Sequence, residues 1–154
     1  MCIRDRVFST AIRYAVGRSG VSVVTLPGDL ADEDASVVAP AIGTLRRSPK
    51  VPSEATIAEF AAEVNKASKI ALFVGAGAKG AHDTVVEFAD KVAAPIGHSL
   101  RGKDFIQYDN PFDVGMTGLL GYGAAAEGIH DADLMIMLGT DFPYDQFLPD
   151  TKTC

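Results

Sequence analysis

Residues Pro95 to Gly123 read PIGHSLRGKDFIQYDNPFDVGMTGLLGYG, and this stretch decides how the rest of the chain is interpreted. It is rich in glycine, which lets a backbone approach a ligand closely, and it is long for a connection inside one domain. Its first residues, Pro95 to His98, are typical of a short strand, and Ser99 to Gly102 follow directly. A guanidinium and free backbone N–H groups would then lie at the carboxyl edge of a sheet, where open α/β folds bind ligands. We therefore interpret the stretch as a cofactor platform.

Strand-like and helix-like patterns alternate on both sides of this platform. Ile70 to Val74 and Leu134 to Leu138 are apolar runs typical of buried strands. Helical spacing predicts one helix capped by Ser53, a second that ends before Pro95, and a third from Leu119 to Ile129. The N-terminus of the third helix would favour an anionic ligand. Alternating strands and helices predict an α/β fold with a parallel, Rossmann-like sheet and right-handed crossovers.

The first third of the chain has a different organisation. Val7 to Gly17 shows helical spacing, and Val21 to Leu26 is a β-branched run that predicts a buried strand. Residues 30–52 mix charges with three prolines and are typical of a linker. A helix and a strand alone cannot form a core, so we expect residues 1–29 to be the end of a truncated domain. Residues 1–6 fit no element and are expected to be non-native.

Composition excludes several classes of partner. The 154 residues include 20 acidic and 14 basic side chains, which gives a net charge of -6, and the basic residues form no stripe that could bind nucleic acid. Cys2 and Cys154 have neither a metal-ligand spacing nor an evident disulfide partner, so a reducing, cytoplasmic setting is expected. No apolar run approaches the roughly 18 residues that a transmembrane helix needs.

A glycine motif follows the strand at residues 70–74. Gly75, Gly77 and Gly80 have the spacing of the dinucleotide fingerprint and lie between a strand and a helix. That fingerprint also expects a carboxylate at the end of the next strand, where this chain has His98 to Arg101, so an ordinary NAD site is disfavoured. The alternative is that these glycines only permit a tight strand–helix turn.

Arg101 and Thr140 are the side chains best placed to contact a ligand. The guanidinium of Arg101 could bind a pyrophosphate or stack on an aromatic ring, and the alternative is a surface ion pair with Asp104. Thr140 follows the strand that ends at Leu138, so its hydroxyl could reach the same ligand. The three histidines have no paired ligand spacing, and we expect no metal site in this chain and no catalytic group.

Three segments resemble one enzyme family, the thiamine-diphosphate-dependent enzymes, and in particular its pyruvate dehydrogenase (quinone), or pyruvate oxidase, group. They are GVSVVTLPGDL (20–30), APIGHSLRGKDFIQYDNPFDVGMTGLLGYG (94–123) and DADLMIMLGTDFPY (131–144). The resemblance implies that residues 1–29 are the C-terminal tail of a pyrimidine-binding domain and that residues 53–154 are a central FAD-binding domain cut at its C-terminal end.

The resemblance also implies where FAD would contact this chain. The implied cofactor-binding residues are Ser99, Leu100, Arg101, Gly102, Tyr122, Gly123, Ala124, Ala125, Ala126 and Thr140, with Gly75 and Gly77 as a weaker inference. The chain departs from the family at 123–126, where glycine and alanines replace more polar residues, so only backbone contacts could persist there. Thiamine diphosphate, Mg²⁺ and the catalytic glutamate would belong to domains that this sequence does not include.

For the intact enzyme the resemblance implies decarboxylation of pyruvate to acetate and CO₂, with electrons passed through FAD to a quinone. The chain alone is expected to be inactive. Two alternatives stay open: a carboligase of the acetolactate synthase type, in which FAD is structural, and a non-catalytic nucleotide-binding or structural domain. The resemblance further implies a homotetramer or homodimer, and peripheral contact with the inner face of the cell membrane through a tail beyond Cys154.

Overall fold

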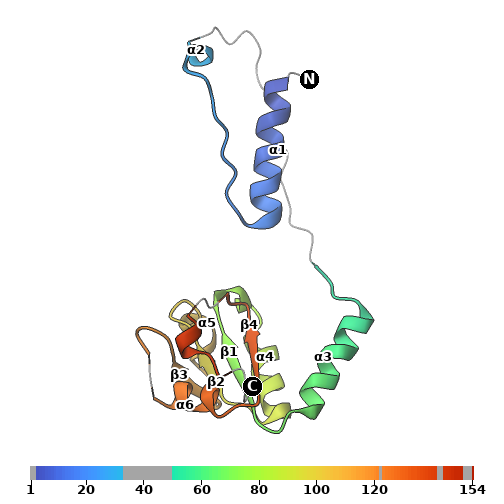
Figure 1. The fold of residues 1–154 in the computed structure, drawn as a ribbon, viewed down its shortest axis with the longest axis vertical. Coiled ribbons are helices and arrows are strands. Elements are labelled where there is room, and N and C mark those ends of the chain that lie inside the picture. Colours follow the sequence, from blue (N-terminus) through green and yellow to red (C-terminus); the bar gives the residue numbers. More distant parts are fainter. Residues whose placement is uncertain (1–2, 33–49, 122, 142–143, 151–153) are drawn as a thin grey trace. The chain divides into compact units, whose positions relative to one another are not determined.

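The computed structural model describes residues 3–32, 50–121, 123–141, 144–150 and 154 (Figure 1). The chain divides into two compact units, Met1–Pro52 and Ser53–Cys154. The second unit contains all of the strands in the described residues.

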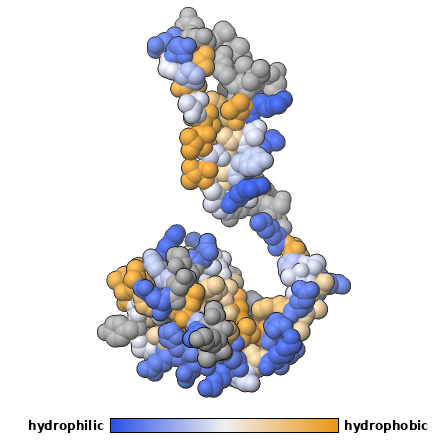
Figure 2. Space-filling view, viewed as in Figure 1, coloured by the Kyte–Doolittle hydropathy of each residue, from blue (hydrophilic) through white to orange (hydrophobic). Residues whose placement is uncertain are grey.

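The first unit contains two helices, α1 (Ile3–Arg18) and α2 (Gly28–Ala31). The helix predicted over 7–17 lies within α1, but the strand predicted over 21–26 is wrong, because that segment has no strand pairing. Val21 and Val23 are 92% and 87% exposed. A strand requires a hydrogen-bonded neighbour, and the described residues of this unit supply none. Apolar side chains are accordingly exposed along one side of the unit (Figure 2).

The second unit is a parallel sheet with helices between its strands. In chain order its elements are α3 (Glu54–Lys66), β1 (Ile70–Val74), the 3₁₀ helix η1 (Ala76–Ala78), α4 (His82–Val92), β2 (Ile96–His98), α5 (Lys103–Ile106), β3 (Asp113–Met116), α6 (Ala124–His130), β4 (Leu134–Leu138) and the 3₁₀ helix η2 (Asp145–Phe147). The strand order is β3-β2-β1-β4, and every pairing is parallel. The predicted α/β fold with a parallel sheet is therefore confirmed.

The sheet is covered on both faces, and alternate residues of each strand contribute to opposite sides. On one face Leu72, Val74 and Ile96 pack with Val85 and Ala89 of α4. On the other face Ala71 and Phe73 pack with Ile129 of α6 and with Ala132. β1 is buried on both faces and is a continuous apolar run, as such strands are. β4 is only partly buried but is also a continuous apolar run, so both strands could be recognised from the sequence.

The structure corrects the predicted start of the third helix. The prediction was Leu119 to Ile129, whereas α6 spans Ala124–His130. Gly118 and Gly123 have φ angles of 120° and 89°, and an isolated antiparallel bridge joins Gly118 to Gly121. A residue with such a φ angle cannot continue a right-handed helix, so the chain turns twice before α6 begins.

Candidate functional site

A groove of about 450 Å³ lies at the carboxyl edge of the sheet. Every strand contributes to it through the residues that follow or end the strand. The lining residues are Ala76 after β1; Ser99, Leu100 and Arg101 after β2; Met116, Thr117, Gly118, Leu119 and Leu120 at the end of β3; and Gly139, Thr140, Asp141 and Tyr144 after β4. A parallel sheet brings these four chain segments together, although they are distant in sequence.

The structure brings Arg101 and Thr140 into this one groove, together with Ser99 and Leu100. Arg101 is exposed, and it makes no ion pair with Asp104 or any other described carboxylate. The ion pair weighed as an alternative is therefore absent from the described part of the chain. The guanidinium is available to an anionic or aromatic ligand.

The turn after β2 exposes only part of its backbone. The Ser99 amide donates to the Val74 carbonyl at 3.0 Å, and the Gly102 amide donates to the Ser99 carbonyl at 2.9 Å and to the Ser99 hydroxyl at 3.1 Å. The amides of Leu100 and Arg101 have no acceptor among the described residues. Of the four N–H groups expected to be free, that of Ser99 bonds to β1 and that of Gly102 bonds within the turn, so two remain for a ligand.

Gly102 supports the groove without lining it. It is buried, and a Cβ atom at this position would lie 2.4 Å from the Val74 carbonyl oxygen. Only glycine lets the turn pack this closely against the end of β1. The predicted role of Gly102 as a direct ligand contact stays a prediction, since its amide is already bonded.

Gly75 and Gly77 pack against the segment that follows β4. Their amides donate to the carbonyls of Leu138 and Gly139 at 2.9 and 2.8 Å. A Cβ atom on Gly75 would lie 2.5 Å from the Thr140 Cβ, and one on Gly77 would lie 2.8 Å from the Gly139 Cα. Neither glycine lines the groove, so close packing at a strand–helix turn explains both, and their contact with FAD receives no support from this geometry.

The segment predicted at 122–126 contributes no lining residue among those that the structure describes. Tyr122 lies outside the described residues. Gly123 and Ala124 are exposed, Ala126 is half-buried, and Ala125 is fully buried with its Cβ 3.5 Å from the position a Gly97 Cβ would take. Ala125 therefore packs α6 on the sheet, and its predicted contact with FAD stays a prediction.

Sequence reasoning did not select the wall formed by Met116 to Leu120, or Tyr144. Leu119 and Leu120 are 63% and 70% exposed, so the groove has apolar side chains open to solvent. The Tyr144 ring packs on Phe147 edge-on, with 6.3 Å between ring centroids. Both leucines had been predicted to belong to the helix from Leu119 to Ile129, so they were not recognised as a wall of the groove.

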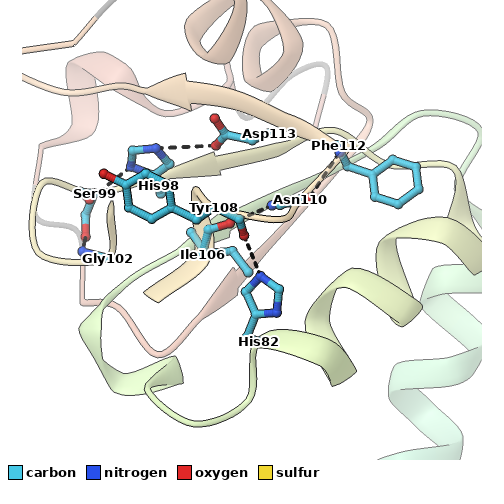
Figure 3. Close-up of polar contacts among 9 residues, drawn as sticks. All are labelled: His82, His98, Ser99, Gly102, Ile106, Tyr108, Asn110, Phe112 and Asp113. Carbon is cyan, nitrogen blue, oxygen red and sulfur yellow. Dashed lines mark hydrogen bonds and ion pairs between the residues drawn. The ribbon is translucent and has the colours of Figure 1, made fainter. Parts of the chain in front are cut away.

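Two histidines, His98 and His82, make side-chain contacts within the protein. His98 is 1% exposed at the end of β2, and it does not line the groove. His82 bridges two oxygens, with its Nδ1 2.8 Å from Asp83 Oδ1 and its Nε2 2.8 Å from the Tyr108 carbonyl (Figure 3). The hydrogen bond with Asp83, and secondly the one with Tyr108, raise the pKa of His82 above its usual value. No cluster of metal-ligating side chains occurs in the described residues.

None of the helices that the structure describes is both long enough and apolar enough to cross a bilayer.

Residues 57–153 match the family model of the thiamine pyrophosphate enzyme central domain. A solved structure described as a "putative thiamin diphosphate-dependent enzyme" from Mycobacterium smegmatis has the same fold, with a TM-score of 0.51 and 25% sequence identity. The match covers 72% of this chain and 24% of that one.

Curated relatives align along almost the whole chain. A protein from Pseudomonas amyloderamosa, named only as an uncharacterized 42.6 kDa protein, is 44% identical over 93% of this chain and 37% of its own length. The "Putative thiamine pyrophosphate-containing protein YdaP" of Bacillus subtilis is 35% identical over 94% of this chain and 25% of its own length. The acetolactate synthase isozyme 1 large subunit of Escherichia coli is 30% identical over 96% of this chain and 27% of its own length.

The chain thus spans between a quarter and just over a third of the length of these relatives. The parallel sheet, the match to the family model over residues 57–153 and the relatives that align along the chain agree with one another, and the chain belongs to the thiamine pyrophosphate enzyme family, whose central domain it contains.

Proposed function

We propose that the groove at the carboxyl edge of the sheet binds FAD, as part of a thiamine-diphosphate-dependent pyruvate oxidoreductase. The observation that carries this proposal is the presence of Arg101 and Thr140 in one groove, with two unbonded amides beside the guanidinium. A cation and free N–H groups suit a pyrophosphate.

The walls of the groove suit the aromatic rings of FAD. Leu119 and Leu120 offer exposed apolar surface, and Tyr144 offers an aromatic ring. An aromatic cofactor ring gains from both kinds of contact. Ser99 and Thr140 add hydroxyl groups that can accept or donate hydrogen bonds. Residues present at the groove therefore fit a dinucleotide that has an anionic centre and flat aromatic ends.

The chemistry of the reaction would come from the cofactors, and this chain's part is to hold one of them. Arg101 and the amides of Leu100 and Arg101 would hold the anionic part. Leu119, Leu120 and Tyr144 would exclude water from the aromatic part. Thiamine diphosphate and Mg²⁺ would be held by parts of the protein beyond this chain. Pyruvate and a quinone are proposed as reactants because the motif RGKDFIQYDNPFDVGMTGLLG resembles that of the pyruvate oxidase group.

Titration of FAD into the chain, followed by quenching of flavin fluorescence, tests the binding step. We expect saturable binding that weakens by roughly tenfold to a hundredfold in Arg101→Gln, since a charge-assisted contact to phosphate contributes roughly 1.5–3 kcal/mol. Lys69→Gln is the matched control, because it removes one positive charge just before β1, at the opposite edge of the sheet, and should leave binding unchanged. Equal affinity in Arg101→Gln and the unaltered chain would show that the groove does not bind FAD through this residue.

A carboligase is the second candidate, and the acetolactate synthase relative favours it. The two activities differ in their products. The longer protein that contains this chain, supplied with pyruvate and a quinone analogue, should form acetate and reduce the quinone if the oxidoreductase proposal is right. Formation of acetolactate without quinone reduction would establish the carboligase instead.

A further inference from the structure

A buried histidine, His98, immediately precedes the Ser99–Arg101 turn that lines the groove, and its side chain contacts the Ser99 carbonyl and the side chain of Asp113 in β3. The His98 side chain is 2% exposed and that of Asp113 is 17% exposed. The His98 Nε2 is 3.4 Å from Asp113 Oδ1, and the Nδ1 is 3.3 Å from the carbonyl oxygen of Ser99 (Figure 3). One ring therefore joins the first residue of the turn after β2 to the first residue of β3.

Two buried polar atoms of this pair, the His98 Nε2 and the Asp113 Oδ1, have no hydrogen-bond partner among the described residues. The His98 Nε2 and Asp113 Oδ1 lie within ion-pair distance, although they are not aligned as a hydrogen bond, and neither atom has a hydrogen bond elsewhere. A buried polar atom without a partner is costly, so removing either side chain would leave the other uncompensated. The two residues should be energetically coupled.

The contact spans an irregular part of the sheet. Ile96 pairs with Asp113 and Gly97 pairs with Gly115, so Val114 is passed over and the register shifts between these pairs. Gly115 has a φ angle of 92°. A bulge of this kind changes the direction of the strand that carries it. Here the strand continues into Met116 and Thr117, which line the groove.

The backbone of His98 completes the connection, because its carbonyl accepts the Thr117 amide at 3.4 Å. Thus β3 is fixed to His98 at both ends of the irregular segment, by the side chain at Asp113 and by the backbone at Thr117. We propose that His98 and Asp113 are positioning residues that set the distance between the Ser99–Arg101 turn and the Met116–Leu120 wall, and so determine how tightly the groove holds its ligand. This inference rests on the proposed function for the identity of that ligand.

Three substitutions test the coupling. His98→Leu removes both ring nitrogens, His98→Gln keeps a side-chain amide that can donate, and Asp113→Asn keeps the shape while removing the charge. With FAD as the probe, we expect about a tenfold loss of affinity in His98→Leu, within the cost of orphaning a buried polar group. His98→Gln should recover most of the affinity. The loss in the double variant His98→Leu/Asp113→Asn should be smaller than the sum of the two single losses.

A core variant separates positioning from general stability. Ile136→Val removes one methyl group from the core on the α4 face, and a lower melting temperature is expected without a change in FAD affinity. If Ile136→Val weakens FAD binding as much as His98→Leu does, or if His98→Gln is as poor as His98→Leu, the positioning role is refuted. Additive losses in the double variant would refute it too.

A second readout does not depend on FAD. Hydrogen exchange of the Thr117 amide in the ligand-free chain should be accelerated about tenfold in His98→Leu and in Asp113→Asn, but not in Ile136→Val, because local opening of β3 requires less free energy once the contact is lost. Unchanged exchange in both variants would overturn the inference. If the unaltered chain binds no FAD at all, the proposed function fails, and the exchange measurement alone decides the positioning role.

Discussion

At the scale of single residues, the hydrogen-bond donors and acceptors of a side chain decide which contacts it can make. His82 faces an oxygen on each side, the Asp83 carboxylate and the Tyr108 carbonyl. A neutral imidazole has one N–H, whereas the protonated ring has two, so this environment favours the charged form. Asp109 lines the same surface as His82 and Asp83 and adds negative charge near the ring.

This arrangement predicts a pH dependence of stability. The pKa of His82 is raised in the folded chain, so its contribution should be fully present below about pH 6.5, the ordinary histidine value, and should be lost as pH rises through the higher folded pKa. The unaltered chain should therefore have a larger free energy of unfolding than His82→Gln at low pH. The two free energies should become equal at high pH.

The matched control for that measurement is His130→Gln, which alters a histidine exposed at the end of α6. A difference between the unaltered chain and His82→Gln that grows as pH rises would contradict the assigned contacts.

At the scale of elements, the ends of helices follow from local chemistry where a cap is present. The Ser53 hydroxyl accepts the Thr56 amide at 3.2 Å and lies 2.9 Å from the Thr56 hydroxyl, so the predicted cap of α3 is present. This helix has no fully buried residue, and Ile57 and Phe60 are 52% and 46% exposed. Its stability should depend on its cap more than that of a well-buried helix would.

Ser53→Ala should therefore destabilise α3 by about 1 kcal/mol, because one N-terminal amide loses its acceptor. Hydrogen exchange of the Thr56 amide measures this directly. Ser53→Asp keeps an acceptor at the same position and should restore protection. Equal protection in Ser53→Ala and the unaltered chain would mean that packing, rather than the cap, holds the first turn.

At the scale of the whole molecule, the sheet has an open edge. β4 pairs with β1 on one side, and no strand within the described residues pairs with its other side. Met137 in this strand is 46% exposed. An exposed apolar edge strand is a site for association between chains. We therefore expect the isolated chain to be only marginally soluble.

Met137→Lys should raise the soluble fraction of the expressed chain and lower light scattering at a given concentration, since a lysine on an edge strand opposes pairing. Ala62→Lys adds the same charge to an exposed position of α3 and controls for net charge. If both variants raise solubility equally, charge alone is responsible and the edge of β4 is not the cause.

The amino-acid sequence was enough to predict the parallel α/β architecture and the bounds of β1 and β4, because both strands are uninterrupted apolar runs that can be recognised without knowledge of their neighbours. It also placed Arg101 and Thr140 at strand ends, where a ligand edge must lie. Only the tertiary structure decided that Val21 to Leu26 forms no strand, since pairing requires a partner that no local pattern reveals. It likewise revealed β3, whose short, glycine-containing segment lacks a β-branched run.

The roles of the glycines also depend on the tertiary structure. Gly75 and Gly77 match a nucleotide fingerprint in spacing, yet their amides are taken by the end of β4, which lies beside them only because the chain reverses its order in the sheet. The leucines at 119 and 120 form a groove wall instead of a helix because positive φ angles at Gly118 and Gly123 direct the chain away from helical geometry. Sequence patterns specify what each segment can form, and contacts between distant segments decide which of those possibilities is used.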